Sequence, residues 1–265
     1  MGDARQRGRT FREGLVALGF LTVVPVPEGA WRDPGSFGRS FAWFPLVGLG
    51  VGAALALAAL ALGTVLPPLP AAALLVALWA ALTGGLHLDG LMDAADGLLC
   101  AKSPADRLAV MQDSGVGAFG VLAGGCVLLV KFAALGVLLD PGARDGLFLA
   151  LFLAPLLGRW AMVLLAVGFP YAGRAGGLGG TFTRGAGRRE LALASATGGL
   201  ALLAGCLLAG NPSPVLATLS GGVAAAGVAL LALRRVGGLT GDVYGAAGEL
   251  FEVAALVALC GWYAG

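Results

Sequence analysis

Three aspartates lie within eight residues in the stretch "TGGLHLDGLMDAADGLL", residues 83–99, where most neighbours are apolar. On a helix, Asp89, Asp93 and Asp96 stand at i, i+4 and i+7 and fall within an arc of roughly 60°, so they share one face. Carboxylates this close repel one another unless a cation neutralises them. No Lys or Arg lies between Leu86 and Ala101, so the segment predicts a site for a divalent cation.

A solvated helix end would explain one such aspartate. Three on one face, with leucines on either side, favour a functional site instead, because charge is costly to bury near a bilayer. His87 is the only histidine of the chain, which excludes a histidine-rich metal site. Oxygen ligands and a hard ion such as Mg²⁺ are therefore expected.

The stretch "RLAVMQDSGVGAFG" brings Arg107, Asp113 and Ser114 to the start of a long apolar run. The glycines of 115–120 match G-x-G-x-x-G, but no strand precedes them, so a dinucleotide-binding fold is not expected. The N-terminus of the helix that follows could still receive a phosphate through its free backbone N–H groups.

A second acidic cluster, "GGLTGDVYGAAGELFE", contains Asp242, Glu249 and Glu252 at the start of the last apolar run. An unpaired carboxylate inside such a run is expensive. Two interpretations stay open for the glutamates: pairing with Lys131 or Arg159, which lie within other apolar runs, or a role in binding a ligand.

The loop 171–190, "YAGRAGGLGGTFTRGAGRRE", is rich in glycine and carries Arg174, Arg184, Arg188 and Arg189. It is either a basic loop attracted to anionic lipid or a clamp for phosphate groups.

The elements that carry these residues belong to an all-α, polytopic membrane helix bundle, because 58% of the residues are hydrophobic, only 12% are charged and the mean hydropathy is +0.89. We expect a single integral membrane domain over residues 1–265. About seven transmembrane helices are predicted, near residues 40–62, 70–88, 117–139, 146–168, 191–210, 214–233 and 245–263.

The N-terminal segment starts with basic residues, and its apolar stretch is too short to cross a bilayer. It resembles a signal peptide but lacks an A-x-A-like cleavage site, so a short interfacial or re-entrant helix is expected. The four cysteines are scattered and should behave as small hydrophobic residues.

The basic residues are distributed unevenly between the two sets of loops. With a cytoplasmic N-terminus, 14 of the 17 Lys and Arg fall on the inside and only Arg144 falls outside. This bias predicts that the N-terminus and the polar segments face the cytoplasm.

Several of these strings together resemble the cobalamin synthase family, the adenosylcobinamide-GDP ribazoletransferases. They are "TGGLHLDGLMDAADGLL", "MQDSGVGAFG", "GGLTGDVYGAAGEL", "TFTRG" and the early "FAWFPLVGLGVG". The resemblance covers nearly the whole chain.

The resemblance implies the last assembly step of the cobamide nucleotide loop, with Mg²⁺, at the cytoplasmic face of the bacterial inner membrane. A hydroxyl of α-ribazole or its 5′-phosphate takes the adenosylcobinamide-phosphate group of adenosylcobinamide-GDP. GMP leaves, and adenosylcobalamin or its 5′-phosphate forms. The expected partners are these small molecules and the lipid bilayer, without nucleic acid, and a homo-oligomer stays open.

Under this resemblance Asp89, Asp93 and Asp96 bind the metal, and Asp113 is a further ligand or the base. The residues expected to bind substrate are His87, Arg107, Ser114, Arg174, Arg184, Asp242 and Glu249. The position after Ser114 is often basic in the family but is Gly115 here. This departure puts a phosphate contact there in doubt, and Arg107 or the arginines of 174–189 would substitute.

Two alternatives come from other protein classes. A CDP-alcohol phosphotransferase would share the "DAADG" opening, but Cys100-Ala101 departs from its motif and Asp113 has no second Asp four residues later. A cation-coupled transporter would place its acidic residues near the bilayer midplane between inverted repeats, and the sequence has no evident repeat.

Overall fold

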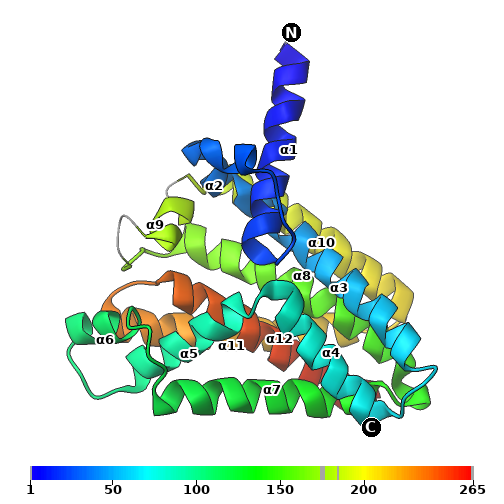
Figure 1. Ribbon diagram of the computed structural model, residues 1–265. Coiled ribbons are helices and arrows are strands. Elements are labelled where there is room, and N and C mark those ends of the chain that lie inside the picture. The colour runs from blue at the N-terminus through cyan, green and yellow to red at the C-terminus, as the bar shows by residue number, and fades with distance from the viewer. Residues whose placement is uncertain (1, 174–176, 184, 264–265) are drawn as a thin grey trace.

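The computed structural model describes residues 2–173, 177–183 and 185–263. As Figure 1 shows, this part of the chain is built from helices, which confirms the predicted all-α class. The helices are α1 (Gly2–Leu21), α2 (Pro34–Ser40), α3 (Phe44–Leu62), α4 (Pro68–Thr83), α5 (Leu86–Leu99), α6 (Pro104–Val110), α7 (Ala118–Leu138), α8 (Arg144–Gly168), α9 (Leu178–Thr183), α10 (Arg188–Ala209), α11 (Ser213–Val236) and α12 (Gly241–Tyr263).

Within the described residues, six helical segments are long and apolar enough to cross a membrane: Pro34–Leu62, Ala118–Leu138, Pro141–Gly168, Arg188–Ala209, Ser213–Val236 and Gly241–Tyr263. A seventh span arises if α4 and α5 are counted together, although they are bent by 89°. The expected continuous span at 70–88 is therefore wrong in detail. The helix breaks at Gly84 and Gly85, whose φ angles of 62° and 69° favour glycine.

The span of α8 and that of α12 form the centre of the bundle. Their apolar stretches are 72% and 67% buried, whereas those of α10 and α11 are only 17% and 28% buried. Helix α12 packs against α5, α7, α8 and α11. The outer helices expose leucines, as expected where lipid replaces water around the bundle.

The loops predicted to lie on the outer side of the membrane gather at one end of the bundle. A side chain at Gly63 would approach Arg144, and Tyr263 Oη lies 3.3 Å from Asn211 Nδ2. Helices α6 and α9 lie toward the opposite end, beside the start of α12 (Figure 1). The alternation of the two sets of loops is thus reproduced.

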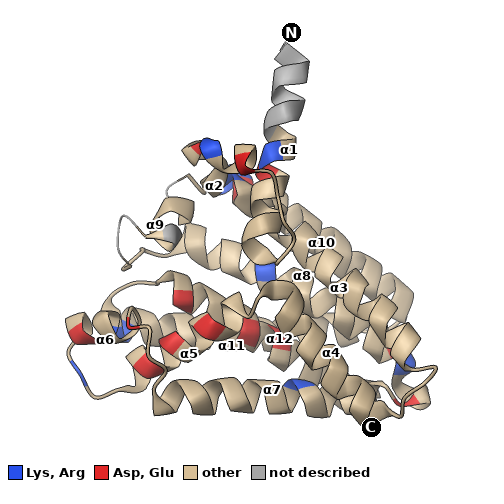
Figure 2. Cartoon of the chain, in the orientation of Figure 1, with Lys and Arg blue, Asp and Glu red and all other residues tan. Residues whose placement is uncertain are grey.

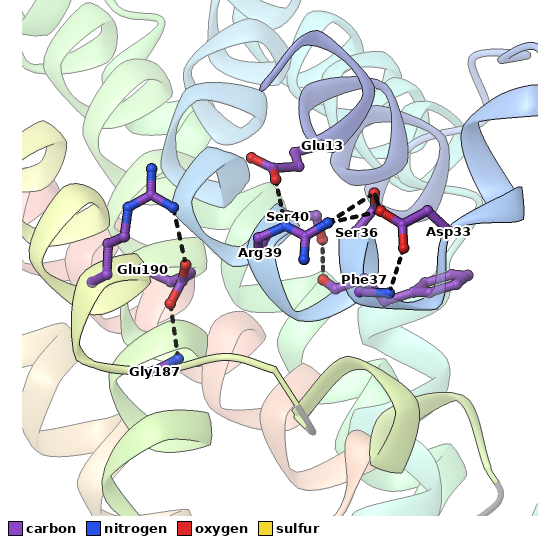
Figure 3. Close-up of polar contacts among 10 residues, drawn as sticks. Glu13, Asp33, Ser36, Phe37, Arg39, Ser40, Gly187 and Glu190 are labelled. Carbon is purple, nitrogen blue, oxygen red and sulfur yellow. Dashed lines mark hydrogen bonds and ion pairs between the residues drawn. The ribbon is translucent and has the colours of Figure 1, made fainter. Parts of the chain in front are cut away.

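Helix α1 is not among the candidate spans, as expected for the N-terminal segment. Its second half buries Val16, Ala17 and Leu21, and α1 packs on α2 and α3. Arg39 of α2 fastens this corner: its Nε donates to Glu13 Oε1 at 2.5 Å and its Nη2 to Asp33 Oδ2 at 2.8 Å (Figure 3).

Candidate functional site

All three aspartates lie on helix α5, as predicted, and this helix begins directly after the bend at Gly84–Gly85. Their exposure falls along the helix: Asp89 is exposed, Asp93 is half-buried and Asp96 is buried. The three carboxylates therefore have different surroundings despite their common spacing.

Two glycines bring α5 and α12 unusually close. A Cβ added at Gly90 would lie 3.1 Å from both Cα and O of Asp242, and one at Gly245 would lie 3.2 Å from Cα and O of His87. Small residues allow helix backbones to approach in this way. The crossing places Asp242, the first acidic residue of α12, beside the acidic face of α5.

The carboxylates of Asp89, Asp93 and Asp242 form the candidate site. The charge of Asp93 is close enough to interact with those of Asp89 and Asp242, and Asp242 also interacts with Asp89. Among the described residues, no Lys or Arg forms an ion pair with any of the three. Figure 2 shows acidic residues gathered on α5 and at the start of α12. The site is therefore electronegative, and no countercharge pairs with it within the described ranges.

Asp96 has different hydrogen-bond partners from its two neighbours in the motif. Its Oδ2 accepts the N–H of Gly117 at 2.7 Å and its Oδ1 accepts that of Gly120 at 2.9 Å. Both oxygens thus cap the start of α7, where free N–H groups favour an anion. The sequence expectation of a phosphate at this helix start is corrected, because the anion found there is the Asp96 carboxylate.

Arg107 is buried, and its Nε and Nη1 donate to backbone carbonyls. Its Nη1 donates to the carbonyls of Gly97 and Leu98, at 3.2 and 2.5 Å, and its Nε donates to that of Lys102 at 2.9 Å. These bonds satisfy carbonyls that the end of α5 leaves free. Arg107 thus caps the end of α5, and its expected contact with substrate stays a prediction.

Asp113 and Ser114 lie exposed in the connection from α6 to α7. Asp113 Oδ1 accepts the N–H of Gly115 at 3.2 Å, a bond that shapes the turn and leaves the other oxygen open to solvent. Both residues lie on the chain segment that Asp96 fastens to α5, but neither is joined to Asp89, Asp93 or Asp242 by a described hydrogen bond.

Glu249 lies in a buried ion pair, 2.7 Å from Lys131 Nζ. Glu252 pairs with the same Lys131 and with Arg159. Of the two interpretations that the sequence left open, the structure shows the pairing, and the expected ligand contact of Glu249 stays a prediction. His87 is also buried, with Nδ1 lying 3.2 Å from Arg159 Nη2.

The glycine-rich loop reaches the start of α12. Tyr171 and Leu239 form a β-bridge, and a Cβ at Gly179 would lie 3.3 Å from Gly241. The loop therefore lies beside Asp242, whereas Arg174 and Arg184 fall outside the described residues. Arg188 and Arg189 are exposed, and Glu190 Oε2 accepts the N–H of Gly187 at 3.0 Å (Figure 3).

Comparison with known proteins identifies a family that matches nearly the whole chain. The model of the cobalamin-5-phosphate synthase family matches residues 13–260. The chain belongs to this family. Adenosylcobinamide-GDP ribazoletransferase of Desulfitobacterium hafniense is 42% identical over 92% of this chain and 94% of its own. The protein of the same name in Pseudomonas paraeruginosa is 45% identical over 92% of this chain and 96% of its own. No solved structure matches the chain at a significant level.

The donor set of this cobalamin-5-phosphate synthase family member fits a hard cation, because Asp89, Asp93 and Asp242 offer only oxygen. Within the described ranges, no three His, Cys, Asp or Glu side chains are arranged to hold a metal by themselves. Mg²⁺ commonly binds through one or two carboxylates and completes its shell with water and substrate phosphates. The arrangement suits a cation that binds together with a pyrophosphate.

Three features of the site were not foreseen. Thr240 Oγ1 donates to Asp242 Oδ2 at 3.1 Å and so orients the carboxylate, and the rings of Tyr171 and Tyr244 stack with centroids 6.5 Å apart. The third is the contact between His87 and Arg159. The "TGD" triplet at 240–242 carries a local signal for the first, since threonine often bonds two residues along the chain.

Proposed function

We propose that this chain is an adenosylcobinamide-GDP ribazoletransferase. The family and the relatives, which match over more than nine-tenths of both chains, support this activity. The proposed reaction moves the adenosylcobinamide-phosphate group of adenosylcobinamide-GDP to α-ribazole or α-ribazole 5′-phosphate. GMP is released, and adenosylcobalamin or its 5′-phosphate is formed.

The observation that carries the proposal is the group of three carboxylates at the α5–α12 crossing, which have no ion-pair partner among the residues that the structure describes. In the reaction, the ribazole hydroxyl oxygen bonds to the phosphorus on the cobinamide side. The bond from that phosphorus to the oxygen shared with GMP breaks, and the hydroxyl proton passes to a base. A pyrophosphate is itself anionic, so it can approach Asp89, Asp93 and Asp242 only together with a cation.

We assign Mg²⁺ to this group of carboxylates, with Asp89, Asp93 and Asp242 as the residues that would hold it. A bound Mg²⁺ supplies charge neutralisation on the phosphoryl oxygens and on the leaving GMP. Asp93 and Asp242 are half-buried, so the packing around them holds their carboxylates in place. The exposed Asp89 leaves one side of the site accessible. Asp113, which is exposed and has a free oxygen, remains our proposal for the base.

The proposed location is the bacterial inner membrane, with this site facing the cytoplasm. The charge distribution supports the orientation, because the inside loops hold 14 of the 17 Lys and Arg. The site also lies at the end of the bundle opposite the loops that hold Arg144 and Asn211 (Figure 1). In this proposed location, lipid surrounds the outward-facing leucines of α10 and α11.

The experiment uses the full chain purified in detergent, with adenosylcobinamide-GDP, α-ribazole 5′-phosphate and Mg²⁺. Release of GMP that depends on both substrates, with a corrinoid product of matching mass, is the expected result. A CDP-alcohol with an acceptor alcohol serves as the matched substrate control. Release of CMP from that mixture, without GMP from the first, would overturn the assignment.

A further inference from the structure

A cluster of buried charges joins α7, α8 and α12, and we call it the ionic tetrad: Lys131, Arg159, Glu249 and Glu252. Lys131 of α7 lies 2.7 Å from Glu249 and 2.5 Å from Glu252, both on α12. Arg159 of α8 pairs with the other oxygen of Glu252. Two positive and two negative charges balance, so the tetrad needs no further ion.

The tetrad continues to α5 through one contact. Arg159 Nη2 lies 3.2 Å from His87 Nδ1. A guanidinium can only donate, so Nδ1 must accept, and an accepting Nδ1 belongs to a neutral ring that carries its proton on Nε2. His87 is 2% exposed, and its Nε2 has no hydrogen-bond partner within the described part of the chain.

The contact between Arg159 and His87 is important because of where His87 lies in α5. His87 lies in the first turn of α5, just after Gly84 and Gly85, and two residues before Asp89. Glycines leave the direction of the following helix weakly determined. The backbone of His87 also packs closely against Gly245 of α12, where the two helices cross. A side chain that fixes this turn therefore fixes α5 relative to α12.

We propose that Arg159, held by Glu252, positions α5 through Nδ1 of His87 and thereby sets the separation of Asp89 and Asp93 from Asp242. His87 is then a positioning residue, and it neither contacts substrate nor carries a proton in the reaction. This inference rests on the proposed function for its kinetic consequence, but its structural consequence is independent of the reaction.

Three substitutions separate the two ring nitrogens. Asn places an acceptor near the position of Nδ1, Gln places its polar atoms near that of Nε2, and Leu offers neither. We expect His87→Asn to keep kcat for GMP release within about threefold of wild type, and His87→Gln and His87→Leu to lose about tenfold or more. The pH profile of His87→Asn should match that of wild type, because a neutral positioning ring does not titrate in the reaction.

The opposite order, with His87→Gln active and His87→Asn inactive, would overturn the proposal in favour of a role for Nε2. Equal activity in all three variants would also overturn it, because the contact with Arg159 would then be dispensable. Ser195→Ala is the matched control: it removes a hydrogen bond of 3.0 Å between Trp160 Nε1 and Ser195 Oγ, on the residue next to Arg159. We expect no change from it.

A distance measurement tests whether His87 sets the position of α5 relative to α12, without using the reaction. Spin labels at the exposed Leu99 of α5 and Val257 of α12, in a chain whose four cysteines are alanine, report the helix separation. We expect one narrow distribution in wild type and His87→Asn, and a broader or shifted one in His87→Leu and Glu252→Gln. Unchanged distributions in both of the latter would overturn the positioning role even if GMP release fails for another reason.

Discussion

Asp93 lies near Asp89 and Asp96 on its own helix and near Asp242 on α12, and it has no basic ion-pair partner among the described residues. Asp96, three residues later, is surrounded by N–H donors instead. The two residues therefore stabilise different states: Asp96 the folded protein, and Asp93, by our proposal, the reacting substrate. Replacing each should separate stability from activity.

Removal of the Asp96 carboxylate should destabilise the protein. Asp96→Ala leaves the N–H groups of Gly117 and Gly120 without their acceptor, so we expect the free energy of unfolding to fall by about 1–3 kcal/mol. Thermal unfolding in detergent without metal measures this. Asp113→Asn is the control, because it alters only an exposed turn contact. An unchanged melting temperature for Asp96→Ala would show that the cap is not important.

Removal of divalent ions should abolish the reaction. The three carboxylates of the site offer only hard oxygen ligands, so GMP release should stop in EDTA and return with Mg²⁺ or Mn²⁺. Thermal unfolding should change little, because the described residues form no metal cluster of their own. Full turnover in the presence of chelator would refute the assignment of a metal.

At the scale of the elements, the site depends on the contact between α5 and α12. Gly90→Ala adds a methyl group 3.1 Å from the backbone of Asp242, which must move by a few tenths of an ångström. We expect about a tenfold lower kcat, since a small misplacement of reacting groups is costly. Gly125→Ala, on α7 with open space around it, is the matched control. Wild-type activity in Gly90→Ala would mean that the crossing does not set the site.

Helical periodicity predicted the shared face of the aspartates, because Asp89, Asp93 and Asp96 fall in one helix. It could not predict that Asp96 caps α7, since that partner lies 21 residues away and depends on how the helices pack. Hydropathy likewise predicted a span at 70–88 but not its bend, which two consecutive glycines with positive φ produce. The pairing of Glu249 with Lys131 was one of two open interpretations until the packing of α7 and α12 decided it.

At the scale of the whole molecule, the account requires that the site and the loops at 64–69 and 211–214 face opposite sides of the membrane. Single cysteines introduced in those loops, in a chain without its native cysteines, should react with an impermeant thiol reagent from the periplasm. A cysteine at Lys102 should react only after permeabilisation. The reverse pattern would place the site on the wrong side for its proposed substrates.

The central claim is that the carboxylates at the α5–α12 crossing carry out the chemistry, and GMP release by Asp93→Asn and Asp242→Asn tests it most directly. Each variant keeps the size of the side chain but removes a charge, so we expect normal insertion and a melting temperature near wild type. The rate at saturating Mg²⁺ should fall about a thousandfold, which corresponds to roughly 4 kcal/mol of transition-state stabilisation. Asp106→Asn, exposed on α6, should keep full activity. Rates above about a tenth of wild type in both variants would contradict the account.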